Sequence, residues 1–436
     1  MNQAIVDTPF HLRDNFAPVT EEVSAQGMEV IGSIPPALNG RLLRNGPNPQ
    51  TGWSDHWFFG NGMIHGVEFE NGKANWYRNR YVRTPLWDDP EANAVEAMFE
   101  LDKSAANTHV IHHAGKILAL EEAHLPWEIS PQLETVRAWD FDGKLTTPMT
   151  AHPKVCATNG EMLFFAYSMM PPFLTYHRVS ATGELVQTEE IEVPAATMMH
   201  DFNVTENYVI WMDLPALWDL DSIAGGGLPL NWSPEHGARL GVMPRNGGNA
   251  DITWYDIDPC YAYHPVNAYE EGDNIVIDVC RYASIGTEDD GPALLNRWVI
   301  DTRSGRVSET QIDDRSTEFP RVCDTLIGRK HRYGYMAGLA ESAPYGERYI
   351  KYDMNDFSSK AVELGAGREG SEAVFVKDPN GSSEDDGWLL SYVCDRTTER
   401  GEVLILDAST MSETPVARIL LPARVPMGFH GSWVPF

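Results

Sequence analysis

The chain has 436 residues, of which 42% are hydrophobic and 22% are charged, which is the composition of an ordinary globular protein with ample length for a large core. Its 63 Asp and Glu side chains outnumber its 33 Lys and Arg side chains, and a formal net charge of −30 would repel nucleic acid and anionic membranes alike. We therefore expect no nucleic-acid partner and at most peripheral contact with a membrane.

The cysteines and the first residues favour a reducing compartment. Five cysteines, an odd number, are scattered without a Cys-x-x-Cys pair, which does not make a disulfide framework. The first residues carry no basic region followed by an apolar one, and no apolar run reaches the ~18 residues of a membrane span. We expect a soluble, cytoplasmic protein.

Short β-rich segments, each bounded by Gly, Asn, Asp or Pro, follow one another along the chain. In chain order they cover residues 116–120, 162–167, 208–212, 274–280, 332–336, 388–393 and 403–406. They predict an all-β fold. At this length a propeller of several four-stranded blades accommodates the strands better than a single sandwich, although no WD or kelch repeat is visible. No low-complexity linker interrupts the chain, so we predict a single domain over residues 1–436.

Two apolar segments are broken by Pro and Gly, at residues 169–174 and 214–232. They are read as insertions that cap the strands. In one interpretation they line an apolar tunnel or its entrance, with methionine as an adaptable wall. In the other they are ordinary loops that pack over a blade.

Four histidines stand in separate short motifs, Thr-Ala-His152-Pro, Met-Met-His200-Asp-Phe, Tyr-His264-Pro-Val and Gly-Phe-His430-Gly. Imidazole suits iron, copper, zinc and nickel, so the residue type leaves the metal open. Gaps of 48, 64 and 166 residues exclude a compact zinc finger or a His-Glu-x-x-His helix. His152 and His264 precede a proline, which pushes them toward extended geometry. We expect each histidine to come from a different strand end.

Further motifs appear in a fixed order around these histidines. They are Ile-Pro-Pro-Ala-Leu-Asn-Gly at 34–40, Arg-Asn-Gly-Pro-Asn-Pro at 44–49 and Gly-Asn-Gly-Met-Ile-His-Gly at 60–66. From about residue 34 to residue 435 the chain resembles the carotenoid cleavage oxygenases, the family that includes the retinal pigment epithelium isomerase. One departure is Asn61, where many members carry Asp at a position that is not a metal ligand.

The resemblance implies a seven-bladed β-propeller with a dome of loops and short helices over the metal face. It also implies one Fe²⁺ per chain, held by the four histidines, with no further catalytic residue. Glutamates that accept from the other ring nitrogen are implied behind three of these ligands, because a ligating imidazole usually donates its other N–H to a carboxylate or carbonyl. The implied pairs are Glu122 with His200, Glu318 with His264 and Glu372 with His430, and His152 is left without a carboxylate.

The activity implied is that of a non-heme Fe(II) dioxygenase, which uses O₂ to cleave a C=C double bond of a carotenoid or apocarotenoid into two carbonyl products. The alternative substrate is a phenolic stilbene or phenylpropenoid. In that branch a lysine typically precedes the glutamate that corresponds to Glu122. Here Glu121 stands in place of the lysine, which weakens the phenolic interpretation. Residues expected to line the substrate are Glu121, Met170, Phe173, Phe202 and Phe429.

Two interpretations from other classes remain open at this point. A hydrolase or lactonase propeller would hold calcium or zinc, but calcium needs six to eight oxygen ligands and no Asp/Asn cluster provides them. A metal-free propeller could act as an interaction module, and the four histidines would then be unconnected. Metal analysis separates these cases, while the oligomeric state and the cleaved bond stay open.

Overall fold

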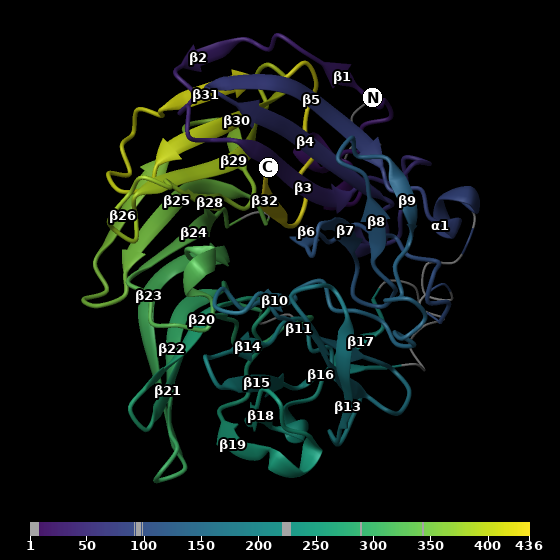
Figure 1. The fold of residues 1–436 in the computed structure, drawn as a ribbon, viewed down its shortest axis with the longest axis vertical. Helices are drawn as coiled ribbons and strands as arrows, with labels where there is room; N and C mark the ends of the chain where they lie inside the picture. Colours follow the sequence, from purple (N-terminus) through teal and green to yellow (C-terminus); the bar gives the residue numbers. More distant parts are fainter. Residues whose placement is uncertain are drawn as a thin grey trace. The chain divides into compact units, whose positions relative to one another are not determined.

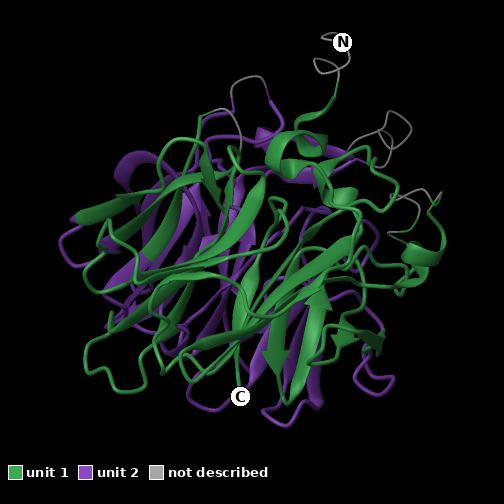
Figure 2. Cartoon of the chain, turned by 90° about the horizontal axis from the view of Figure 1, so that it is seen from above, with its two compact units in different colours: residues 1–139, 335–351, 359–436 green, residues 140–334, 352–358 purple. Residues whose placement is uncertain are grey.

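The computed structural model describes residues 8–90, 92, 97, 99–219, 228–287, 290–341 and 344–436. Strands dominate the ribbon in Figure 1, and the all-β prediction is confirmed. The chain divides into two compact units, coloured in Figure 2. Unit 1 comprises Met1–Trp139, Tyr335–Lys351 and Ser359–Phe436, and unit 2 comprises Asp140–Gly334 and Tyr352–Ser358.

Unit 1 contains a five-stranded sheet of order β1-β5-β4-β3-β32 and a four-stranded sheet of order β6-β7-β8-β9. The first consists of β1 (Ser24–Ala25), β3 (Gly40–Pro47), β4 (Gly62–Glu70), β5 (Lys73–Tyr81) and β32 (Gly431–Pro435). The second consists of β6 (His109–His113), β7 (Lys116–Leu120), β8 (Trp127–Ile129) and β9 (Thr135–Ala138).

The other strands of unit 1 belong to its later segments, with β2 added from the N-terminal part at one edge. They are β2 (Val30–Gly32), β24 (Tyr333–Leu339), β25 (Gly346–Asp353), β26 (Ser359–Glu363), β27 (Arg368–Gly370), β28 (Val374–Lys377), β29 (Gly387–Asp395), β30 (Arg400–Asp407) and β31 (Ala417–Leu420). Strand β29 is almost entirely buried. Its sequence is accordingly a nearly continuous run of apolar and small residues, without the alternation of a strand that has one solvent-exposed face.

Unit 1 joins the two ends of the chain. The last strand, β32, pairs antiparallel with β3, from Gly40 opposite Pro435 to Arg44 opposite Gly431. One core cluster contains Val67 and Tyr77 from the early strands and Leu390 and Ile405 from the late ones. Burying each such side chain stabilises the fold by roughly 1.5–3 kcal/mol. Residues at the far end of the chain are thereby held beside the Arg-Asn-Gly-Pro motif.

Unit 2 contains two four-stranded sheets, of order β10-β11-β12-β13 and β14-β15-β18-β19. It also contains a two-stranded ribbon, β16 with β17, and the antiparallel run β20 to β23. The bounds are β10 (Lys154–Val155), β11 (Met162–Tyr167), β12 (Leu174–Val179), β13 (Leu185–Ile191), β14 (Asn203–Val204), β15 (Tyr208–Asp213), β16 (Ala216–Trp218), β17 (Leu230–Trp232), β18 (Ala238–Pro244), β19 (Thr253–Ile257), β20 (Pro265–Glu271), β21 (Asn274–Arg281), β22 (Leu294–Asp301) and β23 (Arg306–Arg321).

Several short helical turns connect the strands. They are α1 (Pro85–Asp88) and the 3₁₀ turns η1 (Phe10–Leu12), η2 (Asp14–Phe16), η3 (Trp57–Phe59), η5 (Pro234–His236), η6 (Asn249–Asp251) and η7 (Asp324–Leu326). None of the described helices is long and apolar enough to cross a membrane.

Each strand expected from the sequence is present, in β7, β11, β15, β21, β24, β29 and β30. The apolar segment 169–174 forms the connection from β11 into β12. The segment 214–232 contributes the β16–β17 ribbon, and its residues 220–227 lie outside the described part of the chain. The number of propeller blades and the dome of loops stay predictions.

Candidate metal centre

Three of the four histidines belong to unit 2, and each comes shortly before an edge strand of a different sheet. His152 precedes β10, His200 precedes β14 and His264 directly precedes β20. All three are buried, with 6–8% of their surface exposed. The Nε2 atoms of His152 and His200 are 3.0 Å apart, and those of His200 and His264 are 3.1 Å apart. The spacing of the histidines predicts that each comes from a different strand end. The structure places each of these three histidines just before a different strand.

His430 belongs to unit 1, where it directly precedes β32 and is also buried. Strand β3 holds its backbone, because Asn45 N–H donates to the His430 carbonyl at 2.9 Å and Phe429 N–H donates to the Asn45 carbonyl at 3.0 Å. The Asn45 side chain is fully buried and donates to the carbonyls of Ala106 (2.7 Å) and His109 (3.1 Å). The conspicuous motif at 44–49 thus positions the segment that carries His430.

One potential ligand atom from each of His152, His200, His264 and His430 lies within 4.8 Å of the other three. A buried group of four imidazoles with converging nitrogens can hold a metal ion.

Two carboxylates determine which ring nitrogen of their histidine carries the proton. Glu318 Oε2 lies 2.5 Å from His264 Nδ1, and Glu372 Oε1 lies 3.0 Å from His430 Nδ1. An ionised carboxylate can only accept, so each Nδ1 carries the proton and each Nε2 presents a lone pair. For His264 this lone pair is directed at the Nε2 of His200. Nitrogens that converge in this way can share a cation, and the donor set therefore fits a metal ion.

The backbone holds both carboxylates in place. Phe319 N–H donates to Glu318 Oε2 at 2.8 Å, and Gly431 N–H donates to Glu372 Oε2 at 2.8 Å. Both contacts with histidine agree with the pairs expected from the sequence. Glu122 is buried, with 8% of its surface exposed, and its pairing with His200 stays a prediction.

His152 has an acidic neighbour that sequence reasoning missed. From the sequence His152 has no carboxylate partner, yet Asp201 Oδ2 lies 3.8 Å from its Nδ1. Asp201 is also paired with Lys154 at 2.8 Å. The sequence does contain a signal for this neighbour. Asp201 directly follows His200, and Lys154 stands two residues after His152.

The residues expected to line the substrate differ in their surroundings. The Glu121 carboxylate is bound to His124 Nδ1 in a short contact and accepts from Ala123 N–H at 3.2 Å. Phe202 is fully buried and stacks on Trp211 with ring centroids 5.7 Å apart. Phe429 is buried with its ring centroid 4.5 Å from that of Trp57. Phe202 and Phe429 are therefore packed against other aromatic rings.

The remaining two lie in the connection from β11 into β12. Met170 is 55% exposed and Phe173 is half-buried. A role of any of the five side chains in substrate binding stays a prediction.

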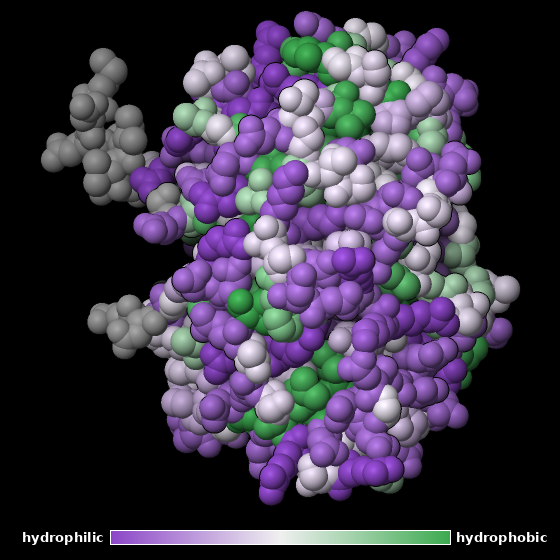
Figure 3. Space-filling model, turned by 90° about the vertical axis from the view of Figure 1, so that its left-hand side faces the viewer, coloured by the Kyte–Doolittle hydropathy of each residue, from purple (hydrophilic) through white to green (hydrophobic). Residues whose placement is uncertain are grey.

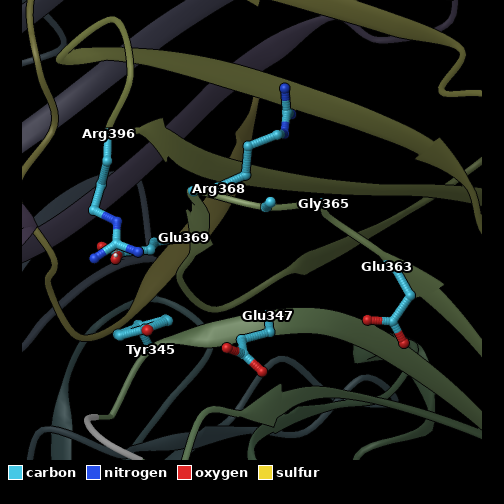
Figure 4. Close-up of a pocket in the computed structure, with 9 residues that line it drawn as sticks. Tyr345, Glu347, Glu363, Gly365, Arg368, Glu369 and Arg396 are labelled. Carbon is cyan, nitrogen blue, oxygen red and sulfur yellow. Dashed lines mark ion pairs between the residues drawn. The ribbon is translucent and has the colours of Figure 1, made fainter.

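A separate pocket of about 250 Å³ lies within unit 1 (Figure 4). In Figure 4 the Arg396 guanidinium lies beside the Glu369 carboxylate, and Tyr345 lies below them. The Arg396–Glu369 ion pair measures 3.1 Å, and Glu363, also in the lining, pairs with Arg348 at 3.0 Å. Its walls carry several charged side chains that are engaged in ion pairs, with one another or with neighbouring residues. The pocket is thus unlike the apolar tunnel expected for a polyene.

Comparison with known proteins agrees with the geometry. The family model described as "Retinal pigment epithelial membrane protein" matches residues 16–435. The carotenoid cleavage oxygenase of Mycobacterium tuberculosis is 38% identical, over 98% of this chain and 97% of its own. The carotenoid 9,10(9',10')-cleavage dioxygenase of Crocus sativus is 35% identical, over 97% of this chain and 89% of its own. The isoeugenol monooxygenase of Pseudomonas putida is 32% identical, over 95% of this chain and 96% of its own.

Solved structures show the same fold. The lignostilbene dioxygenase of Pseudomonas brassicacearum superposes with a TM-score of 0.88 at 28% identity, covering 99% of both chains. A cobalt-substituted apocarotenoid oxygenase of Synechocystis superposes with a TM-score of 0.87 at 26% identity, covering 96% of this chain and 97% of its own. The chain therefore belongs to the carotenoid cleavage oxygenase family, and it is an alkene-cleaving dioxygenase.

Proposed function

We propose that this protein is a non-heme iron dioxygenase that cleaves one C=C double bond of a carotenoid or apocarotenoid. The observation that carries the proposal is the buried group of His152, His200, His264 and His430, whose ligand atoms lie within 4.8 Å of one another. The reaction consumes one O₂ and one alkene and yields two carbonyl compounds, so that each product contains one oxygen atom from O₂.

Iron is proposed as the metal because the resemblance to the carotenoid cleavage oxygenases implies it. An all-imidazole donor set suits iron, although it would also suit copper, zinc or nickel.

The chain's own side chains supply orientation and charge. Four imidazoles contribute no negative charge to the donor set, and Glu318 and Glu372 keep the Nδ1 protons of His264 and His430 in place. Ferrous iron, when bound, supplies the centre at which O₂ is activated toward the alkene. Because the four histidines are buried, bulk water is kept from the reacting atoms.

The preference for a polyene is supported by relatives and by Glu121. Two relatives named for carotenoid cleavage match with 38% and 35% identity against 32% for the isoeugenol enzyme, and a third, of Arabidopsis thaliana, matches with 31%. Glu121 stands where the phenolic branch typically has a lysine, and its carboxylate is already bound to His124. A carboxylate held in this way is a poor partner for a phenol. A polyene needs only apolar surface to bind against, and burying that surface contributes roughly 25 cal/mol of binding free energy per Å². The phenolic alkene is the second candidate because lignostilbene dioxygenase shares the fold.

The test is aerobic incubation of the iron-loaded protein with an apocarotenal and, separately, with a hydroxystilbene under ¹⁸O₂. We expect labelled carbonyl products from the apocarotenal only, and mass spectrometry of the two fragments locates the cleaved bond. The matched control is His200→Ala, which should lose bound iron and turnover together.

Three outcomes would contradict parts of the proposal. Turnover of the stilbene alone would move the protein to the phenolic branch. Products without label would exclude a dioxygenase reaction. Full iron content in His200→Ala would place the metal elsewhere.

A further inference from the structure

A buried ion pair links two of the histidine-bearing segments of unit 2. Lys154 Nζ lies 2.8 Å from Asp201 Oδ1 and 2.9 Å from Asp201 Oδ2. Lys154 stands two residues after His152, and Asp201 directly follows His200. The side chain of Asp201 is 3% exposed and that of Lys154 is 18% exposed. The pair therefore joins the backbone segments of two histidines whose Nε2 atoms are 3.0 Å apart.

Further contacts hold the Asp201 carboxylate in one orientation. Its Oδ1 accepts from Phe202 N–H at 2.7 Å, and Lys154 Nζ also lies 5.9 Å from the centre of the Phe202 ring. Its Oδ2 is directed toward His152, 3.8 Å from Nδ1. Because Pro153 restricts the backbone between His152 and Lys154, a shift of the lysine would be passed on to the histidine.

We propose that Asp201 and Lys154 are positioning residues of the metal centre. Asp201 places a negative charge at the Nδ1 edge of His152, as glutamates do for His264 and His430. Lys154 holds that carboxylate in place and fixes the separation of the His152 and His200 segments. This inference rests on the proposed metal site.

The physical reason is the low dielectric of a buried site. An imidazole that binds a cation through Nε2 gains positive charge, and a carboxylate near its other edge stabilises the bound state. A lone buried carboxylate would be costly, and the lysine offsets that cost. Removing either partner is therefore expected to weaken metal binding by about 10- to 100-fold.

The test measures binding of Co²⁺ alone to the full-length protein, by chelator competition and by its visible absorption, without substrate. We expect Asp201→Asn and Lys154→Met to bind Co²⁺ about 10- to 100-fold more weakly, with an altered visible spectrum. Lys154→Arg keeps the ion pair and should bind within a few-fold of the wild type. Lys116→Met removes the Lys116–Glu128 ion pair of 2.9 Å from strand β7 and should leave Co²⁺ binding unchanged.

The double variant Lys154→Met/Asp201→Asn separates positioning from simple charge neutralisation. If the two residues only neutralise each other, the double variant would regain wild-type affinity, and the inference would be wrong. Wild-type affinity and spectrum in Asp201→Asn would overturn it as well. Failure of the wild type itself to bind Co²⁺ would instead contradict the proposed metal site, so the two failures are distinguishable.

Discussion

At the scale of single residues, the pair Glu121–His124 shows how surroundings decide a side chain's role. His124 Nε2 lies 3.0 Å from the Ala97 carbonyl, and Nδ1 is bound to the Glu121 carboxylate. Both neighbours are acceptors, so the ring is best satisfied as an imidazolium that donates from both nitrogens. The pair lowers the pKa of Glu121 and raises the pKa of His124, in both cases through the charge and hydrogen bond of the partner acting against burial.

These shifts predict a pH window for the contribution of the pair to stability. The contribution of Glu121 is present above its unfolded pKa, about 4.3, and is lost as pH falls through the lowered folded value. The contribution of His124 is present below its unfolded pKa, about 6.5, and is lost as pH rises through the raised folded value. His124→Gln should therefore lower the melting temperature most between about pH 4.5 and 6.5.

Thermal unfolding of both proteins from pH 4 to pH 9 measures this difference, with His112→Gln, an exposed side chain of the neighbouring strand, as control. A difference that grew steadily above pH 7 would have the wrong sign and would exclude an imidazolium in the folded protein.

At the scale of elements, strand β3 and the segment leading into β32 approach so closely that only glycine fits. A Cβ atom on Gly428 would lie 2.9 Å from the Asn45 carbonyl oxygen and 3.1 Å from Gly46 Cα. Gly428→Ala should force the segment away from β3 and cost about 1–3 kcal/mol, as overpacking does. Because His430 follows two residues later, bound metal should fall together with the melting temperature.

Metal content per chain and thermal unfolding check this prediction. Gly291→Ala is the control, because no atom comes within 4 Å of a Cβ built there. Loss of stability with full metal content would show that β3 does not position His430.

At the scale of the whole molecule, the net charge of −30 should destabilise the folded state through self-repulsion. In Figure 3 the visible face is largely hydrophilic, with hydrophobic residues in small separate patches. Raising NaCl from about 20 mM to about 0.3 M shortens the Debye length, so at pH 7.5 the melting temperature should rise by a few degrees. Near the isoelectric point of about 4.7 the same salt step should have little effect. A fall with salt at pH 7.5 would mean that attractive ion pairs outweigh the repulsion.

The sequence by itself determined the strands and the candidate ligands. Segments such as 162–167 are apolar throughout and bounded by turn residues, and this local pattern suffices to predict a buried strand. The four histidines were identified from the short motifs that contain them, and the resemblance to the family implied the Glu318–His264 pair. The location in the cytoplasm and the number of blades stay predictions, because neither follows from a local pattern.

Only the tertiary structure decided which distant side chains meet. Lys154 and Asp201 are 47 residues apart, and nothing in either local sequence requires their ion pair beside His152. Phe202 and Phe429, whose contact with substrate stays a prediction, pack against Trp211 and Trp57, and neither ring contact follows from the local sequence. Strand formation depends on neighbours within a few residues, whereas contacts of this kind exist only after the sheets have packed and buried polar groups have found partners.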